Sequence, residues 1–455
     1  MDSGIAAILE YWTKKVPEEV DKSDLTTISE LLQQVYVAEK WKKNIYSIFL
    51  NYPLSQPSYK TEAKKREKLR EFLDDLLNGV EPLDKLGDCI ACGSRSTRKH
   101  KNRQHIPMTG SGGALNFFSF TSQGADYCDT CAFSVQCSPL TYYACGKLAM
   151  LHSNSAKVMH YWAKRSLANI QQQITLNDYT GCFNEGYTNP QNALFHITQD
   201  LILSYEERWA EENATIRLYH FTNYIQGPDL DIYDLPAPIF RFLAEVQTHA
   251  RRKDWYGIVH RGYYFTKNGK EIGFSVAGKS EGDYKNSKNR VYLNLLAGRS
   301  ILSHFLNIQA RKAYGDYSLL ALYLREILAM DRKRIETVKR VADEIADFIR
   351  HSRDGKKRLR NLEESVKFRD FCNVLRRISK GRISLRAQEP LFTLDEFAEQ
   401  LFPDGALGFG ETRYLILFRL YEQLHDWLLA EGLAEDEVDD TVTEISDDNK
   451  PTSEE

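Results

Sequence analysis

Two Cys-x-x-Cys pairs constrain this 455-residue chain more than any other feature of its sequence. The first pair is Cys89 and Cys92, the second is Cys128 and Cys131, and 35 residues lie between the pairs. A Cys-x-x-Cys turn brings two thiolates to adjacent corners of a tetrahedron, and two such turns complete a four-cysteine zinc site. The spacing therefore predicts structural Zn²⁺ held by these four cysteines. Because a closed four-thiolate site has no open position, we expect no catalysis at this metal.

Other assignments of the cysteines stay open. The four thiols could be buried and free, or one pair could be a redox motif, although a redox motif normally occurs singly. Cys137 and Cys145 could replace a ligand, whereas Cys182 and Cys372 are expected to be small buried apolar residues. Eight cysteines are too few for a disulfide scaffold in a chain of this length, which favours metal binding in a reducing compartment.

Length and composition predict several folding units with sizeable cores. The chain is long enough for about three units, and its 42% hydrophobic content excludes wholesale disorder. The predicted fold class is α+β and predominantly helical, with a central mixed α/β domain that carries the four-cysteine insert. We expect five regions: N-terminal helices (1–82), a zinc-knuckle insert with a basic loop (83–140), a central α+β domain (141–314), a C-terminal helical bundle (315–433) and a disordered acidic tail (434–455).

Local patterns place the elements within these regions. A candidate helix cap at Ser23 precedes an apolar-periodic run, and helical periodicity also covers 144–174 and 192–211. The β-branched and aromatic segments 215–224 and 255–276 predict strands, with Asn268-Gly269 at a tight hairpin turn.

The sequence carries no sign of a membrane segment. Its longest apolar runs break within a few residues, whereas a bilayer span needs roughly 20. The first ten residues contain Asp2 and lack a basic region ahead of an apolar segment. We therefore expect no export signal and a cytoplasmic protein.

The net charge of −3 hides a segregation of charge along the chain. Residues 330–390 contain 18 lysines and arginines against 10 acidic residues, whereas residues 431–455 contain 11 acidic residues and one lysine. The first segment, taken alone, is most simply a solvated helical face. The second is typical of a disordered acidic tail.

Two motifs match enzyme signatures, but their sequence context argues against an enzymatic role. Residues 273–280 satisfy the phosphate-loop pattern GxxxxGK[ST], but the segment lies in a predicted strand and the residues after it are polar. His425-Asp426 resembles a phosphohydrolase dipeptide, yet it lies within a predicted helix and has no evident partner histidines. We therefore expect that the protein is not an enzyme.

Further motifs accompany the cysteine pairs and the basic insert between them. They are Phe117-Phe118-Ser119-Phe120, Tyr127-Cys128, Cys145-Gly146-Lys147-Leu148, Leu151-His152-Ser153, Tyr219-His220-Phe221-Thr222-Asn223 and Gln226-Gly227-Pro228-Asp229. In combination they resemble the CXXC-CXXC large subunit of type I-B CRISPR Cascade effector complexes. The resemblance covers roughly residues 80–300.

The resemblance implies a non-catalytic subunit of an RNA-guided complex that recognises the motif flanking a DNA target, promotes duplex opening and R-loop formation, and recruits a helicase-nuclease. Its implied partners are guide RNA, target DNA, a multi-copy backbone subunit, a subunit capping the 5′ end of the guide and a helical small subunit. The small subunit can be translated from inside the large-subunit gene, which makes Met330 a candidate internal start. The alternative is that Met330 is a methionine of a helix core. A stand-alone zinc-containing DNA-binding accessory protein remains the alternative.

Positive and amide side chains, and the backbone amides of the glycine loop that begins at Gly110, give candidate nucleic-acid contacts. Candidates for duplex DNA are Arg98, Lys99, Lys101, Arg103, Gly110, Ser111, Gly112, Lys285, Asn286, Lys288, Asn289 and Arg290. Candidates for the displaced strand are Lys356, Lys357, Arg358, Arg360, Arg376, Arg377, Lys380 and Arg382.

Overall fold

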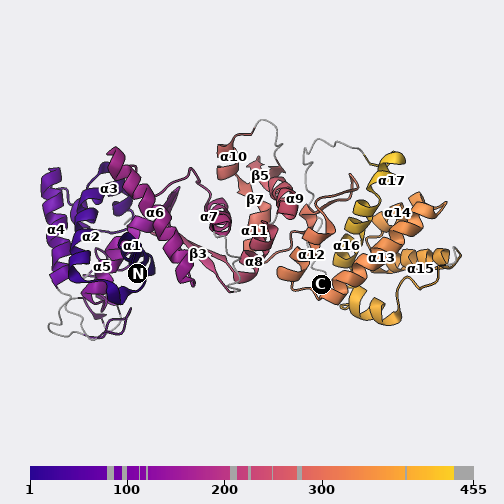
Figure 1. The fold of residues 1–455 in the computed structure, drawn as a ribbon, viewed down its shortest axis with the longest axis horizontal. Coiled ribbons are helices and arrows are strands. Elements are labelled where there is room, and N and C mark those ends of the chain that lie inside the picture. Colours follow the sequence, from indigo (N-terminus) through magenta and orange to yellow (C-terminus); the bar gives the residue numbers. More distant parts are fainter. Residues whose placement is uncertain are drawn as a thin grey trace. The chain divides into compact units, whose positions relative to one another are not determined.

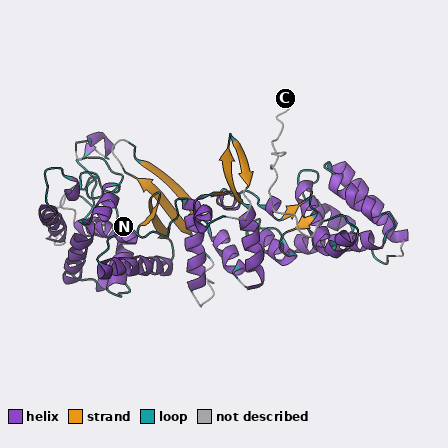
Figure 2. Ribbon diagram, turned by 90° about the horizontal axis from the view of Figure 1, so that it is seen from above, coloured by secondary structure: helices purple, strands orange, loops and turns teal. Residues whose placement is uncertain are grey.

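The computed structural model describes residues 1–78, 87–94, 100–111, 113–118, 121–204, 213–223, 227–247, 249–273, 279–384 and 387–434. Helices dominate the described residues, and the strands form small antiparallel sheets (Figure 2). The predicted fold class, α+β and predominantly helical, is therefore confirmed. The chain divides into two compact units, one of residues 1–201 and 213–236, the other of residues 202–212 and 237–455. Segment 141–314 contributes to both units.

Four helices begin the first unit (Figure 1): α1 (Asp2–Tyr11), α2 (Lys22–Tyr36), α3 (Glu39–Tyr46) and α4 (Glu62–Asn78). The expected cap at Ser23 is wrong, because α2 begins two residues earlier, after Asp21. The Asp21 carboxylate accepts the Asp24 N–H at 2.9 Å, and the Asp24 carboxylate accepts the Asp21 N–H at 2.8 Å. Two aspartates in this reciprocal arrangement satisfy two amide groups, which one serine at position 23 would not.

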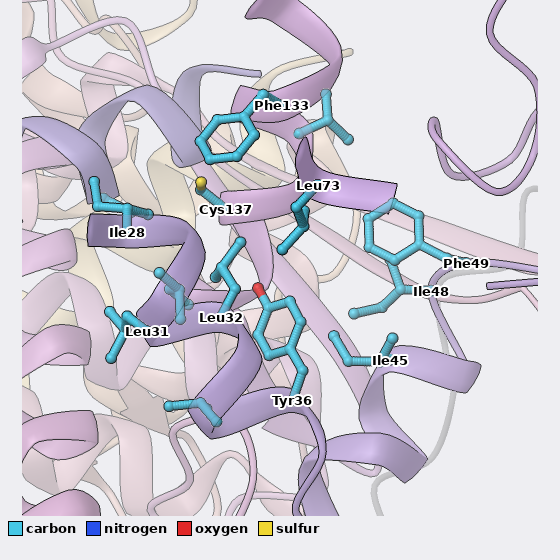
Figure 3. Packing of buried hydrophobic residues seen from close by; sticks show 14 of the residues in the cluster. Ile28, Leu31, Leu32, Tyr36, Ile45, Ile48, Phe49, Leu73, Phe133 and Cys137 are labelled. Carbon is cyan, nitrogen blue, oxygen red and sulfur yellow. The ribbon is translucent and has the colours of Figure 1, made fainter. Parts of the chain in front are cut away.

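The core of the first unit joins these helices to the segment after the second cysteine pair. Figure 3 shows Tyr36 of α2 and Leu73 of α4 among the packed side chains, with Phe133 and Cys137 from α5 (Asp129–Cys137). The buried Tyr36 hydroxyl donates to the Gln136 carbonyl at 2.8 Å. This core therefore holds α5 against the N-terminal helices.

A four-stranded antiparallel sheet completes the unit, in the order β1 (Tyr143–Cys145), β2 (Lys147–Ser153), β3 (Ile216–Thr222) and β4 (Asp229–Leu235). The expected strand at 215–224 is confirmed by β3. The expected helix at 144–174 is wrong in its first part, because β1 and β2 form a hairpin around Gly146 (φ +71°), and α6 (Ala156–Leu176) starts only afterwards. The next helix, α7 (Pro190–Ser204), covers the first part of the expected helix at 192–211.

The second unit opens with α8 (Ala237–Val246) and α9 (His249–Arg261), followed by the hairpin of β5 (Tyr263–Lys267) and β6 (Lys270–Gly273). The expected strand from residue 255 is wrong up to Arg261, because Trp255 is a buried residue of α9 that packs edge-on against Phe242. The hairpin turn is confirmed: Asn268 and Gly269 have φ angles of 52° and 77°.

Short elements connect the hairpin to the C-terminal helices. They are α10 (Glu281–Asn286), β7 (Lys288–Asn289), which pairs with β5, α11 (Arg290–Leu296), β8 (Leu306–Asn307) and β9 (Lys312–Ala313).

A helical bundle ends the described chain, with α12 (Tyr317–Glu326), α13 (Arg332–His351), α14 (Gly355–Glu364), α15 (Phe368–Ser384), the π-helical turn Glu396–Leu401, α16 (Phe409–Gln423) and α17 (His425–Ala430). Helices α13 and α16 pack on each other, and both contribute fully buried side chains, among them Ile345 and Leu417. Within the described ranges, no helix combines the length and the apolar character that a bilayer crossing requires.

Candidate metal centre and nucleic-acid interface

The structure brings the two Cys-x-x-Cys pairs together. One sulfur from each of Cys89, Cys92, Cys128 and Cys131 lies within 4.8 Å of the others, and the Cys92 and Cys128 sulfurs are 3.8 Å apart. A tetrahedron with metal–sulfur bonds of about 2.3 Å has edges of about 3.8 Å. The cluster is therefore a possible metal site whose donor chemistry and spacing fit Zn²⁺.

Each pair is shaped by local backbone hydrogen bonds. In the first, the Cys89 N–H bonds the Ser94 carbonyl and the Gly93 N–H bonds the Cys89 carbonyl, both at 2.8 Å. Gly93 has a φ of +72°, which favours glycine over any residue with a Cβ. In the second, Cys128 caps α5 and its sulfur accepts the Cys131 N–H at 3.4 Å. The N-terminal end of a helix favours a thiolate at this position.

The protonation of the cluster also favours a bound cation. Hydrogen bonding to Cys131 lowers the pKa of Cys128 to about 5, and the same bond raises the pKa of Cys131. Thiols this close compete for negative charge, since like charges disfavour one another. A divalent metal removes that competition, because coordinated thiols are deprotonated.

The remaining cysteines lie outside this cluster. Cys137, Cys145 and Cys182 are buried, and Cys372 is half-buried. Burial raises the pKa of Cys145 to about 12 and also raises the pKa of Cys137 and of Cys182. These thiols stay neutral at pH 7, as expected of small apolar residues.

The basic insert between the pairs is partly turned inward. Lys101 is 1% exposed, and its ammonium group pairs with the Asp129 carboxylate, which lies inside the second cysteine pair. Its backbone bridges to Ala125, and the neighbouring His100 lies 2.9 Å from the Asp126 carboxylate. Lys101 therefore does not present its charge to solvent, in contrast to its predicted role as a phosphate contact.

The other candidates of the insert are placed only in part. Arg98, Lys99 and Gly112 lie outside the described residues. The Gly110 carbonyl accepts the Arg103 N–H at 3.1 Å, and a Cβ at Gly110 would lie 2.8 Å from the Phe117 ring. Ring packing thus explains the glycine at position 110, without any approach of DNA.

The segment 285–290 is largely engaged within the second unit. Lys285 pairs with Glu281 at 2.7 Å and Arg290 pairs with Glu271. Asn286 donates to the Gly282 carbonyl at 2.7 Å. Asn289 is 1% exposed and its side chain caps α11, so it serves folding rather than groove contacts. Lys288 is exposed.

In the bundle, the predicted displaced-strand contacts separate into two groups. Arg358 lies 3.4 Å from Asp354, and Arg382 is 9% exposed and pairs with Glu344. The others are exposed: Lys356, Lys357 and Arg360 on α14, and Arg376, Arg377 and Lys380 on α15. Of these, Lys356 pairs with Glu431.

Sequence reasoning missed one member of the α15 surface. Arg369 is exposed and precedes Arg376 by seven residues and Lys380 by eleven, so the three share one face of the helix. Helical periodicity applied to α15 would have found it. We name Arg369, Arg376, Arg377 and Lys380 the α15 basic stripe.

The structure describes the enzyme-like motifs only in part. Gly273 ends β6, residues 274–278 lie outside the described residues, and Ser280 caps the six-residue α10. His425-Asp426 starts α17 and belongs to neither cluster of potential metal ligands found among the described residues. The second of those clusters is Glu185, His196 and Asp200. Arg165 forms ion pairs with the carboxylates of both Glu185 and Asp200, so the negative charge of this second cluster is already balanced from within the protein.

Comparison with known proteins identifies the cysteine-rich segment. Residues 83–143 match a family model described as CRISPR-associated protein (Cas_CXXC_CXXC). No curated protein and no solved structure matches the chain. The matched segment holds all four clustered cysteines, the basic insert between them and α5. Residues 83–143 are thus similar to the CRISPR-associated CXXC-CXXC proteins, which supports a CRISPR-associated role for this chain.

Proposed function

We propose that the protein is the non-catalytic large subunit of an RNA-guided type I-B CRISPR surveillance complex in the cytoplasm. In this role it recognises the motif flanking a DNA target, promotes duplex opening and R-loop formation, and recruits the helicase-nuclease. The observation that carries the proposal is the family match over residues 83–143, in which all four cysteines converge on one site. Its partners are guide RNA, target DNA, the backbone, 5′-capping and small subunits, and the helicase-nuclease.

We propose Zn²⁺ as the metal of the four-cysteine site. Bound there, it cross-links the two pairs and so fixes both ends of the basic insert. Lys101 and Asp129 add an ion pair between the insert and the second pair. The site thus supplies a stable base for the residues of the insert that reach DNA, with Arg98, Lys99 and Arg103 as candidates.

Phosphate contacts in this account come from the exposed cations. The guide reads the target by base pairing, and the protein reads the flanking motif and holds the displaced strand. The α15 basic stripe, together with Lys357 and Arg360 on α14, supports binding of that strand, because these side chains are exposed. Each phosphate contact steepens the salt dependence of binding by about one unit.

Met330 fits a separate translation start for a small subunit. It directly precedes Asp331, whose carboxylate caps α13 by accepting the Lys333 and Arg334 N–H groups. A product starting there would contain α13 to α17. It would lose the bond from the Tyr317 hydroxyl to the Ile335 carbonyl (2.9 Å) and the pair of Arg311 with Glu363 (2.7 Å).

The proposal is tested with the complex reconstituted with and without this subunit, on DNA targets whose flanking bases are randomised. We expect the selected targets to share a short flanking motif only when the subunit is present. Equal enrichment of all flanking sequences, or the same motif without the subunit, would contradict the proposed recognition. Binding of bare DNA by the protein without any RNA would favour a stand-alone DNA-binding protein.

A further inference from the structure

One flank of α9 presents aromatic and cationic side chains in a row. Arg252, Tyr256 and His260 follow each other at intervals of four residues and therefore share one side of the helix. The adjoining face of the helix carries Trp255, Ile258 and Val259, which are buried in the core. Tyr284 of α10 extends the row, because its ring lies 4.9 Å from the His260 ring, and Figure 1 shows α9 near β5 and β7.

Neighbouring side chains pack against the rings of this row, and the rings remain partly exposed. Tyr284 packs edge-on against the buried Tyr263 ring at 5.0 Å, which fixes its orientation. The Arg252 guanidinium lies 5.6 Å from the centre of the Tyr256 ring. Arg252, Tyr256, His260 and Tyr284 are each intermediate in exposure. Burial lowers the pKa of His260, so its imidazole is a neutral flat ring at pH 7.

Two exposed lysines are available to a ligand of the row. Lys253 on α9 and Lys288 on β7 are exposed, and within the described residues neither has a carboxylate partner. Glu281 pairs with Lys285, whereas Asp283, which caps α10 together with Ser280, and Asp254 of α9 add negative charge near the row. Cations next to partly exposed rings complement a ligand that combines negative charge with flat apolar faces.

We propose that this row, Arg252-Tyr256-His260-Tyr284, is a stacking surface for the unpaired bases of a nucleic acid strand. The inference rests on the proposed function and adds a site to it, one that reads bases as flat rings rather than by sequence. From Arg252 to His260 the row runs about 12 Å along α9, enough for about two to three stacked bases. Lys253 and Lys288 lie where the phosphates of such a strand are neutralised.

Other ligands fit the row less well. A duplex keeps its bases stacked inside and offers only phosphates and groove edges to such a surface. An acidic protein would match the lysines, but it would leave the partly exposed rings of Tyr256 and Tyr284 unmatched. Single strands of DNA and RNA share the chemistry that the row recognises, and the test separates them.

The test uses the full-length, zinc-loaded protein and fluorescence anisotropy with three 12-nucleotide probes: oligo-dT, oligo-rU and an abasic strand with the same phosphates. We expect Tyr256→Ala to weaken binding of a base-bearing strand about tenfold, the size of one lost aromatic stack. Binding of the abasic strand should not change. Tyr256→Phe keeps the ring and should bind within twofold of wild type, as should the control Tyr11→Ala, which removes an exposed tyrosine of α1. A larger loss on one base-bearing probe assigns the row to DNA or to RNA.

Equal weakening on the abasic strand, or no weakening on any probe, would overturn the proposal. Tyr256→Leu, which keeps an apolar side chain but has no ring, must repeat the result of Tyr256→Ala, so that a folding defect is not mistaken for lost stacking. A triple variant, Arg376→Ala, Arg377→Ala and Lys380→Ala, separates this site from the proposed function. If only the triple variant binds weakly, the displaced-strand role stands and the stacking surface fails. If wild type binds no probe, both fail.

Discussion

The metal-centred insert and the C-terminal bundle use their positive charges in different ways. In the insert, Lys101 is enclosed and its charge is balanced by Asp129, directly beside two cysteines of the metal site. In the bundle, the α15 basic stripe faces solvent, while Arg382 on the same helix is drawn inward by Glu344. A carboxylate within reach in the fold thus turns a basic side chain inward, and a basic side chain without one stays exposed to solvent, where we propose that it binds nucleic acid.

Removing one cysteine of the metal site should produce the largest difference between the two regions. We expect Cys128→Ser to lose the bound metal, because three thiolates and a hydroxyl form a poorer site. The insert should then become sensitive to protease, since structural zinc contributes on the order of 10 kcal/mol to the folding of small zinc domains. Mass spectrometry of the metal content and limited proteolysis measure both effects.

The matched control for that variant is Cys372→Ser in α15, which lies outside the cluster. It should keep about one zinc per chain. Equal metal content in the Cys128 and Cys372 variants would contradict the four-cysteine site, and proteolysis spread evenly over the bundle would contradict a local effect.

Breaking the enclosed ion pair should come next in size. Lys101→Met removes the ammonium group that balances the buried Asp129 carboxylate and should lower the free energy of unfolding by about 3–5 kcal/mol. Lys380→Met in the exposed stripe should change it by no more than about 0.5 kcal/mol. Urea unfolding monitored by circular dichroism compares the two variants.

A double variant sharpens this result. Adding Asp129→Leu to Lys101→Met removes the buried carboxylate and should recover part of the lost stability. If Lys101→Met is as stable as Lys380→Met, Lys101 is not buried in an ion pair, and it would again be a candidate for DNA binding.

These cases show what the sequence reveals about the site. The four cysteines could be predicted because the chemistry of a Cys-x-x-Cys turn is local, and Asn268-Gly269 because its turn is local too. The burial of Lys101 could not be predicted, since its partner Asp129 lies 28 residues away and only the fold brings them together. Asn289 has an amide side chain of the kind that contacts bases in a groove, but this side chain caps α11. The row on α9 was missed because residues 255–261 were expected to form a strand, which would have placed Tyr256 and His260 on the same side as the buried Ile258.

The contact of Gly4 with α5 tests how closely α1 packs in the metal-centred region. A Cβ at Gly4 of α1 would lie 1.7 Å from the Ser134 carbonyl oxygen of α5. Gly4→Ala should therefore push α1 away from α5 and lower the free energy of unfolding by about 1–3 kcal/mol. Gly410→Ala on α16 has nothing within 4 Å and should not destabilise the protein. Thermal unfolding distinguishes the two, and equal melting temperatures would argue against close packing of α1 on α5.

The smallest effect expected is on nucleic-acid binding in the bundle. Replacing Arg376, Arg377 and Lys380 together by alanine should reduce the slope of log affinity against log salt by about two to three units. The matched control replaces three cations of α4, Arg66, Lys68 and Arg70. Salt titrations of single-strand binding give the slope, and an identical loss in both variants would show that net charge alone is responsible.

The central claim is tested most directly by purifying the protein through a C-terminal tag from its own operon. Intact mass and RNA sequencing then identify what accompanies it. We expect guide RNA, the other complex subunits and a second tagged polypeptide that begins at Met330. A full-length chain that is alone and free of RNA would contradict membership of a guide complex and would favour a stand-alone zinc-containing DNA-binding protein.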